Sequence, residues 1–515
     1  MNGAESLVRT LSACGVEVCF SNPGTSEMHF VAALDRVAEM RAVLCLFEGV
    51  ATGAADGYGR MAEKPAATLL HLGPGLANGL ANLHNARRAA TPIVNIVGDH
   101  ATYHAQCDPP LASDIAGFAR PVSAWVQSST TAKTVAADAA RAVQTARQAP
   151  GQIATLILPA DTAWLEAERP AAPLPVPGPS PVQGVAIDDV ARALGEGCKT
   201  AILMRGAALG TRGLEAAGRI AARTNARLLC DTFAPRLARG AGIVAVERIP
   251  YFAEQMVEFL APFEQLVLVG AKPPVSFFAY PGKPSWCVPE GCRILYLAQP
   301  HEDGVAALEA LADAVGATRE VRSRAALTRP GLPKDDKLNP YSVGQVIGEL
   351  LPENAIISDE AATSGIGIAV FTANAPPHDT LALTGGSIGQ GVPLATGAAI
   401  ACPDRKVVCV QGDGGAMYTL QALWTQAREK LDVTTVIFAN RSYYILNIEL
   451  MRVGAENPGP KALSMLDLHN PELNWVQLAQ GMGVEATRTE SIAEFAAAFA
   501  DTMKTRGPRL IEVVL

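Results

Sequence analysis

The chain has 515 residues, of which 49% are apolar and only 18% are charged. That composition is typical of a globular protein, and roughly 150 residues per domain suggests about three domains. The net charge of −8 is spread along the chain, and no block of Lys or Arg could follow a phosphate backbone. Nucleic acid is therefore excluded as an expected partner.

The first 15 residues predict an amphipathic helix, because they lack the basic stretch and apolar run of a signal peptide. The longest apolar runs have the length of strands, well below the ~20 residues that span a membrane. The ten Cys residues show no metal-type spacing and are typical of small buried side chains in a reducing compartment. We therefore expect a cytoplasmic protein that contacts no membrane.

Short apolar strands alternate with Ala-rich helical stretches in three successive blocks, which predicts parallel sheets with helices on both faces. The fold class expected is α/β, with three doubly wound domains at residues 1–165, 183–328 and 338–515. A Pro-rich stretch at 165–184 forms an extended linker, and a loop at 329–340 separates the last two blocks. The strands expected are 16–21, 42–47, 67–71, 93–97 and 153–158 in the first block, 201–204, 227–230, 265–270 and 293–297 in the second, and 355–358, 407–411, 433–439 and 510–514 in the third.

The third block contains a glycine-rich turn after a buried strand. The strand at 406–411 runs into the sequence GDGG, and a helix is expected to start near Ala416. Glycines allow the backbone to approach a ligand closely, and a helix N-terminus attracts an anion. The carboxylate of Asp413 beside an anion site is explained if Mg²⁺ lies between them. The residues expected to shape the phosphate site are Gly412, Gly414 and Gly415.

A second strand of this block, at 434–439, ends in Asn440-Arg441-Ser442. Parallel neighbouring strands bring their carboxyl ends to the same edge of a sheet, where α/β proteins bind ligands. Asn440 could then offer its amide oxygen to the same ion, and Ser442 its main-chain carbonyl.

Together these features resemble the diphosphate and metal motif of thiamine-diphosphate enzymes. The resemblance rests on the GDG sequence, on the spacing of 27 residues from Asp413 to Asn440, and on the strand context. It implies that Asp413, Asn440 and Ser442 hold Mg²⁺ against the diphosphate of the cofactor. One departure is Ala439, because the family often has two adjacent Asn residues.

The first block contains EGVATGAADGYGR, beginning at Glu48, which resembles the family segment E-x-x-A-x-x-A-A-D-G-Y-A-R. Taken alone, a Glu at a helix N-terminus is explained by the helix dipole. In the family this Glu bonds N1′ of the aminopyrimidine ring, and a buried carboxyl that shares a proton there activates the cofactor. The resemblance therefore assigns activation to Glu48. It also implies a homodimer or homotetramer, because two subunits of the family share each cofactor.

A third segment, GSIGQGVP at 386–393, resembles the family pattern G-x-Φ-G-x-x-Φ-P, where Φ is a large apolar residue. The resemblance places Gly386 and Ile388 at the cofactor, with Ile388 supporting its bent shape. Without the other motifs, the segment would be only a glycine-rich turn before a helix.

The resemblance covers almost the whole chain, in the order pyrimidine-binding, middle and diphosphate-binding domain, and it is nearest to benzoylformate decarboxylases and acetolactate-synthase-like proteins. The segment NPGTSE at 22–27 is similar to the N-P-G-S-N-E of the decarboxylases, whose Ser touches the substrate carboxylate, so Thr25 is expected in that role. His71 ends a strand where the decarboxylase has a His for proton transfer, a task that suits a group with a pKa near neutrality. The alternative for His71 is a purely structural histidine.

Other segments depart from both relatives. The stretch 272–283 carries Phe277, Phe278 and Tyr280 where the decarboxylase has a second His, and His100 and His104 are interpreted as loop residues. The stretch 443–452 lacks the Arg and Trp pattern of acetolactate synthases, and the chain is short for that FAD-binding group, so FAD is not expected. The residues expected to line an apolar substrate pocket, or alternatively to pack a helix face, are Ile445, Leu446 and Ile448, with Glu449 at a polar corner.

The sequence therefore predicts a thiamine-diphosphate- and Mg²⁺-dependent carbon–carbon lyase or transferase. The resemblance implies that it decarboxylates a 2-oxo acid, or joins it to a second carbonyl, through ylide and enamine intermediates. Two alternatives stay open: an acetolactate-synthase-like ligase acting on pyruvate, and a non-catalytic cofactor-binding paralogue. A NAD- or FAD-binding module is disfavoured, because no G-x-G-x-x-G opens a helix after the first strand of a block.

Overall fold

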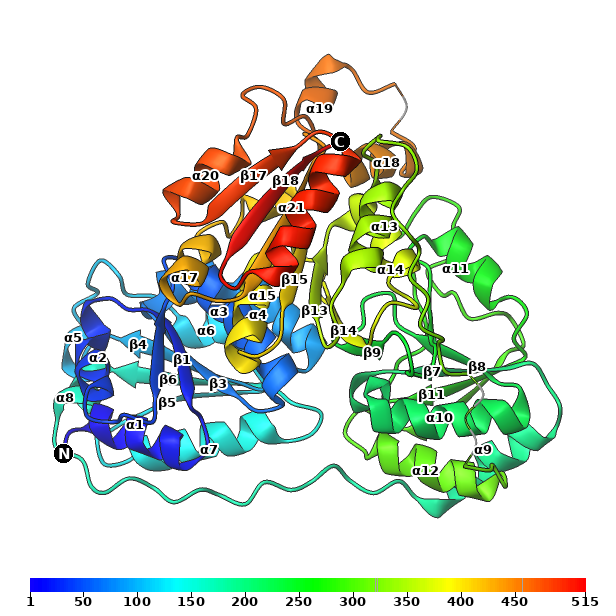
Figure 1. Ribbon diagram of the computed structural model, residues 1–515. Coiled ribbons are helices and arrows are strands. Elements are labelled where there is room, and N and C mark those ends of the chain that lie inside the picture. The colour runs from blue at the N-terminus through cyan, green and yellow to red at the C-terminus, as the bar shows by residue number, and fades with distance from the viewer. Residues whose placement is uncertain (320, 322, 456) are drawn as a thin grey trace.

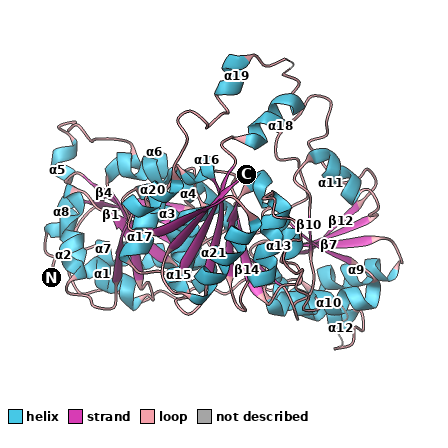
Figure 2. Cartoon of the chain, turned by 45° about the horizontal axis from the view of Figure 1, so that its top comes forward, coloured by secondary structure: helices cyan, strands magenta, loops and turns pink. Residues whose placement is uncertain are grey.

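Three β-sheets, in which nearly all strands run parallel, make up the protein (Figure 1). The computed structural model describes residues 1–319, 321, 323–455 and 457–515. Helices cover the strands on both faces, as Figure 2 shows. The α/β fold class predicted from the sequence is confirmed.

The first sheet is built from the N-terminal part of the chain. Its strands are β1 (Val18–Asn22), β2 (Arg41–Leu44), β3 (Ala66–Leu70), β4 (Ile93–Asp99), β5 (Trp125–Ser128) and β6 (Ile153–Pro159), and its helices are α1 (Gly3–Ala13), α2 (Met28–Leu34), α3 (Glu48–Ala62), α4 (Leu72–Ala89), α5 (Thr102–Ala105), α6 (Ile115–Ala119), α7 (Val135–Arg147) and α8 (Ala160–Trp164). The strand order is β2-β1-β3-β4-β6-β5, and all pairs are parallel. The central strand β3 is buried throughout, because helices cover both faces of the sheet.

The second sheet is smaller and follows the Pro-rich linker, which runs as a long loop along the molecule in Figure 1. Its strands are β7 (Thr200–Met204), β8 (Arg227–Cys230), β10 (Glu247–Arg248), β11 (Gln265–Val269) and β12 (Arg293–Ala298), and its helices are α9 (Gly184–Gly195), α10 (Thr211–Thr224), α11 (Ala253–Leu260) and α12 (Gly304–Ala314). The order is β10-β8-β7-β11-β12, again all parallel.

The third sheet takes its strands from two parts of the chain. They are β9 (Leu237–Arg239), β13 (Ile356–Glu360), β14 (His378–Ala382), β15 (Val407–Gly412), β16 (Val433–Ala439), β17 (Glu485–Thr489) and β18 (Arg509–Val514), and the helices are α13 (Pro340–Leu350), α14 (Ile366–Phe371), α15 (Gly391–Ala401), α16 (Asp413–Ala416), α17 (Ala422–Arg428), α18 (Tyr444–Arg452), α19 (Pro460–Ser464), α20 (Trp475–Gly481) and α21 (Ile492–Lys504). The order is β17-β18-β16-β15-β13-β14-β9. Strand β9 precedes the rest by more than a hundred residues and pairs antiparallel with β14, so the second and third blocks are joined by a strand.

All strands expected from apolar runs occur, with ends shifted by a few residues, and five more appear. The additional strands are β5, β9, β10, β14 and β17. Four of them are edge strands, which are less buried and carry more polar residues than the central strands. Strand β14 is mostly buried, but it begins with the polar sequence His-Asp-Thr. A search for apolar runs therefore misses them.

Helices α3 and α15 cross closely and join the first sheet to the third. Gly57 and Gly397 lie at the crossing, where a Cβ on either would collide with a backbone carbonyl of the opposite helix, at Leu394 and Ala54 respectively. Only glycine permits this approach. One hydrophobic core consequently contains side chains from both sheets.

The cysteines and the helices bear on two further expectations. Six cysteines are buried, but Cys107 is exposed and Cys198, Cys292 and Cys402 are half-buried, so the interpretation of all ten as buried residues is wrong for these four.

Across the described ranges, no helix combines the length and apolarity needed to cross a bilayer.

Candidate active site

Two neighbouring parallel strands, β15 and β16, bring the predicted metal ligands together at their carboxyl ends. The carboxylate of Asp413 accepts a hydrogen bond from the backbone N–H of Arg441 at 2.7 Å and one from Gly414 at 2.8 Å. Arg441 stands between Asn440 and Ser442 in the chain. The two loops that were expected to meet are therefore linked directly by a hydrogen bond.

The donor set at this place suits a magnesium ion. Burial raises the pKa of the Asp413 carboxyl. A cation bound beside this carboxyl would oppose that shift, because it would favour the charged form. The side-chain oxygen of Asn440 accepts from the N–H of Ser442 at 3.1 Å, which fixes the amide near Asp413. Carboxylate, amide and main-chain oxygens are the ligands that Mg²⁺ prefers. Within the part of the chain that the structure describes, no cluster of three His, Cys, Asp or Glu offers another metal site.

The glycines beside Asp413 have different surroundings. A Cβ on Gly414 would collide with the ring of Tyr443, and a Cβ on Gly415 would lie 2.7 Å from Nε2 of Gln411. Gly412 faces open space, with no atom within 4 Å of a Cβ placed there. Close packing thus explains two of the glycines, and the third leaves room beside the backbone.

The helix after this turn differs from the prediction. We expected it to start near Ala416, whereas α16 begins at Asp413, lasts four residues, and is followed by a separate helix from Ala422. Two glycines within α16 weaken the helix, because glycine has a low helix propensity.

A buried carboxylate, Glu360, fixes the loop that carries Gly386 and Ile388. It ends β13 and accepts hydrogen bonds from the three backbone N–H groups of residues 389–391 at 2.6, 2.6 and 2.5 Å. Burial raises the pKa of Glu360, and these hydrogen bonds oppose that shift. Gly386 has a φ of +75° and Gly389 a φ of +94°, which glycine adopts without strain. The shape of this loop therefore depends on a residue that the sequence did not single out.

Helix α4 of the first sheet holds the same loop from another side. Asn85 donates to the carbonyl of Ser387 at 2.8 Å, and Asn82 donates to the carbonyl of Gly389 at 3.2 Å. Ile388 lies between these contacts and is half-buried. The predicted cofactor-supporting loop is thus anchored to two parts of the chain.

Glu48 is the first residue of α3, four residues beyond the end of β2 at Leu44. It is buried, and its Oε2 accepts a hydrogen bond from Asn78 at 3.0 Å. In the described part of the chain its Oε1 makes no hydrogen bond, and Gly75 leaves space beside that oxygen. One oxygen is held in place, and the other is free for a ligand.

His71 precedes α4 and pairs with a buried carboxylate. Its Nδ1 lies 2.8 Å from Oε2 of Glu27, which also accepts from the N–H of Gly24 at 2.7 Å. Because Nδ1 faces a carboxylate, the proton of a neutral ring is assigned to Nδ1, which leaves Nε2 as an acceptor. The imidazole is a quarter exposed, so Nε2 is open to a ligand.

The hydroxyl nearest to this pair belongs to Ser26, not to Thr25. Ser26 Oγ lies 3.3 Å from His71 Nδ1 and 2.5 Å from Oε1 of Glu27, whereas Thr25 is exposed. The structure therefore brings His71, Glu27 and Ser26 together and places Thr25 at the surface beside them.

The other two histidines considered, His100 and His104, have ring centroids 5.7 Å apart, and His104 lies in the one-turn helix α5.

An aromatic cluster from the second block reaches the loop at Gly386. The ring of Phe277 occupies the space where a side chain on Gly386 would lie. It packs against Phe278, Tyr251 and Phe233 with ring centroids 4.9, 5.3 and 5.8 Å apart. The segment that lacks a second His therefore presents a wall of aromatic rings to the predicted site.

Helix α18 carries the other residues expected to line a pocket, and together with α19 it extends from the body of the chain (Figures 1 and 2). Ile445 and Ile448 are half-buried and Leu446 is exposed, so the helix face is not packed into a core. Glu449 is different, because both carboxylate oxygens are buried without a hydrogen bond in the described structure. Arg452 is its nearest cation, at 3.9 Å.

Comparison with known proteins agrees with this geometry. Residues 1–120 match the family model described as the N-terminal TPP binding domain of thiamine pyrophosphate enzymes, and residues 362–513 match that of the C-terminal TPP binding domain. The chain belongs to the thiamine pyrophosphate enzyme family. Both matched regions contain residues predicted from the motifs, Glu48 in the first and Asp413 in the second.

Relatives of this thiamine pyrophosphate enzyme include proteins named acetolactate synthase, benzoylformate decarboxylase and 2-hydroxyacyl-CoA lyase. It is 55% identical over its whole length to a protein of Mycobacterium tuberculosis named "Putative acetolactate synthase large subunit IlvX", covering 99% of that protein. It is 26% identical to a benzoylformate decarboxylase of Pseudomonas aeruginosa, covering 97% of this chain and 96% of the relative. Its fold matches a solved 4-hydroxybenzoylformate decarboxylase of Rhodococcus jostii with a TM-score of 0.85 and 22% identity, over 99% of this chain and 98% of that one. The chain is thus a thiamine-diphosphate-dependent enzyme of the acetolactate synthase and benzoylformate decarboxylase family.

We expect Asp413→Ala to weaken thiamine diphosphate binding in the presence of Mg²⁺ by at least about 100-fold, because it removes the only carboxylate of the predicted metal site. Titration calorimetry of the purified protein measures this directly. Asp404→Asn, a change at an exposed aspartate before β15, is the matched control and should leave the affinity unchanged. Equal affinity in the Asp413 variant and the parent would show that the ion is held elsewhere.

Proposed function

We propose that the enzyme decarboxylates a 2-oxo acid with thiamine diphosphate and Mg²⁺, and then releases an aldehyde or transfers the remaining fragment to a second carbonyl. The bound cofactor would supply the carbanion stabilisation that this chemistry requires. The observation that carries the proposal is Glu48, a buried carboxylate with one oxygen fixed by Asn78 and the other free. A non-catalytic cofactor-binding protein would have no use for that arrangement.

Asp413, Asn440 and the main-chain carbonyl of Ser442 would hold Mg²⁺ against the diphosphate. The loop with Gly386 and Ile388 would support the ring end of the cofactor, held in shape by Glu360. Because family members place the two ends of one cofactor on different subunits, the proposal includes a homodimer or homotetramer with shared active sites.

His71 is proposed to transfer a proton to or from the substrate at Nε2. The buried carboxylate of Glu27 orients the ring through the contact at Nδ1. Thr25, exposed at the same edge, would contact the substrate carboxylate.

We expect His71→Gln to reduce the rate of aldehyde release by about 10²-fold or more, since general acid–base catalysis contributes roughly 10² to 10⁴. In a single turnover, CO₂ release should slow less than aldehyde release if His71 acts after the carboxylate has left. Parallel assays of both products measure this, with the exposed His104→Gln as the control. A variant with unchanged rates for both products would reduce His71 to a structural role.

A second candidate function, ligation of pyruvate to acetolactate, is favoured by the name of the relative with 55% identity. The ring of Phe277, which lies beside the loop at Gly386, also cannot donate a proton for aldehyde release. The experiment that tests both functions incubates the enzyme, thiamine diphosphate and Mg²⁺ with aromatic and aliphatic 2-oxo acids, including pyruvate. An amount of aldehyde equal to the CO₂ released supports the decarboxylase function. Formation of acetolactate or another acyloin supports the ligase function. Absence of CO₂ release from every acid contradicts both functions.

A further inference from the structure

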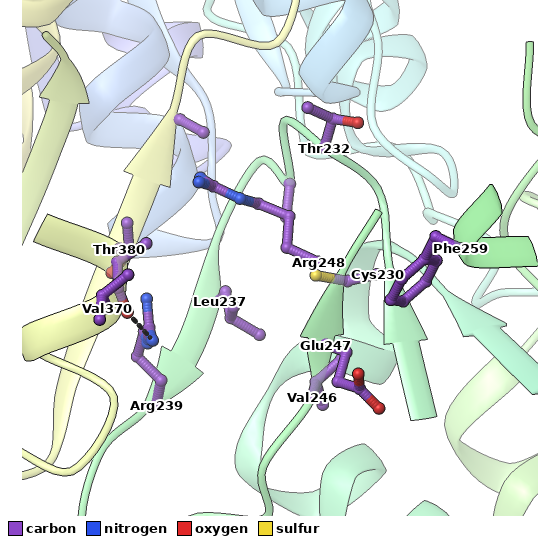
Figure 3. Close-up of a pocket in the computed structure, with 13 residues that line it drawn as sticks. Cys230, Thr232, Leu237, Arg239, Val246, Glu247, Arg248, Phe259, Val370 and Thr380 are labelled. Carbon is purple, nitrogen blue, oxygen red and sulfur yellow. Dashed lines mark hydrogen bonds between the residues drawn. The ribbon is translucent and has the colours of Figure 1, made fainter. Parts of the chain in front are cut away.

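A cavity of about 300 Å³ lies where the second sheet meets the third, between the ends of β8 and β10 on one side and β9, β14 and α14 on the other. Figure 3 shows the side chains that surround it. The cavity lies at the junction of the two sheets, where strand β9 of the second block pairs with β14 of the third sheet. No residue named so far for cofactor or substrate lines it.

Two arginines without a carboxylate partner line this cavity. Arg239 donates to the carbonyl of Ala369 at 2.8 Å, and Arg248 makes no hydrogen bond or ion pair among the described residues. Burial and the charge of Arg248 lower the pKa of Arg239 to about 10. By contrast Arg236, three residues before Arg239, pairs with both Asp379 and Glu63. Positive charge is therefore left uncompensated at the cavity, although ion pairs satisfy a neighbouring arginine.

The carboxylates at this place do not pair with these arginines. Glu247 also lines the cavity, and it forms an ion pair with Arg227. Asp359 at the end of β13 is close enough for both arginines to lower its pKa, but burial outweighs them and raises that pKa. It forms no ion pair with either arginine in the described structure, and its Oδ1 accepts from the N–H of Ala361 at 3.2 Å. Because neither carboxylate forms an ion pair with Arg239 or Arg248 in the described structure, both positive charges at the cavity remain without a partner.

A hydroxyl group at the same wall also lacks a partner. Thr380 on β14 lines the cavity, and its Oγ1 is buried with no hydrogen bond in the described structure. Buried polar groups are nearly always hydrogen-bonded, so an exception calls for an unseen partner. In Figure 3, Thr380 lies next to Arg239, and the side chain of Arg248 also extends toward β14. Leu237 on β9 and Phe259 across the cavity give its lining apolar parts.

We propose that this cavity binds an organic anion, with its phosphate or carboxylate group held by Arg239, Arg248 and Thr380 and its apolar part against Leu237 and Phe259. A bare inorganic anion would leave the apolar parts of the lining uncovered, and a neutral molecule would leave the arginines unpaired. The site is independent of the function proposed above, because it depends on none of the cofactor residues.

Titration calorimetry on the full-length protein tests the site with four probes: phenyl phosphate, phenylacetate, inorganic phosphate and benzyl alcohol. One or both aromatic anions should bind at least ten times more tightly than inorganic phosphate and benzyl alcohol. The two aromatic anions share a body, so their relative affinities identify the preferred head group.

Three variants locate the binding. Arg248→Gln changes an exposed side chain and should weaken binding of the aromatic anion at least tenfold, and Thr380→Val should weaken it severalfold without loss of a hydrogen bond in the free protein. Arg212→Gln removes a surface arginine of the same block, paired with Glu309, and should have no effect. Binding at a thiamine diphosphate site would be insensitive to all three. Unchanged affinity in Arg248→Gln and Thr380→Val, or no binding of either aromatic anion up to about 10 mM, would overturn the proposal.

Discussion

Glu48→Gln is expected to lower the rate of CO₂ release by about 10²- to 10⁴-fold, the range typical of a lost acid–base group. A glutamine amide can accept the hydrogen bond from Asn78 through its oxygen, so the local structure should persist. It cannot share a proton with a ring nitrogen in the way a carboxyl does. Steady-state assays measure the effect, with a 2-oxo acid that the parent enzyme converts and with saturating cofactor and Mg²⁺.

The matched control is Glu39→Gln, which removes the charge of an exposed glutamate in the same block. It should retain the full rate. Calorimetry should show that the Glu48 variant still binds thiamine diphosphate, since its metal ligands are intact. A rate within threefold of the parent would mean that another group activates the cofactor.

Asp56→Ala is expected to destabilise the protein by about 3–5 kcal/mol, the usual cost of leaving one partner of a buried ion pair alone. Asp56 is fully buried and receives two hydrogen bonds from Arg60, at 2.8 and 2.6 Å, and others from Thr91 and Gln390. Arg60 in turn donates to the backbone carbonyls of Pro235 and Ala382. The pair therefore ties together the first, second and third blocks.

Denaturant unfolding followed by fluorescence measures this loss as a shift of the first transition to lower denaturant concentration. Asp189→Ala, which breaks an exposed pair with Arg192, is the control and should cost less than about 1 kcal/mol. A shift in Asp56→Ala no larger than in the control would show that the blocks are held together without this network.

The sequence predicted the parts of the fold that depend on local pattern. Central strands such as β4 and β16 are buried on both faces, so their apolar runs are visible in the sequence. Strand β17, with the sequence EATRT, lies at an edge and shows no such run. Strand β9 could not be assigned to the third sheet, because its pairing with β14 joins segments more than a hundred residues apart.

The candidate site shows the same division. The hydrogen bond from Arg441 to Asp413 follows from two strand ends meeting, which the glycine turn and the strand pattern indicated. The roles of Glu27 and Glu360 depend on which N–H groups and rings lie opposite them in space. The sequence did contain one signal for Glu360, because it is an acidic residue at the end of an apolar strand. Asp413 has a similar position, one residue after the end of β15. Asn78 carried no signal, because an asparagine inside a helix is usually unremarkable.

The measurement that bears most directly on the central assignment is the rate of hydrogen–deuterium exchange at C2 of thiamine diphosphate bound to the protein with Mg²⁺. It requires no knowledge of the substrate, so it separates an active enzyme from a protein that only binds the cofactor. We expect exchange several orders of magnitude faster than in free cofactor, and a return toward the free rate in Glu48→Gln. Exchange at the free rate in the parent protein, with the cofactor demonstrably bound, would contradict the assignment of this chain as a catalyst.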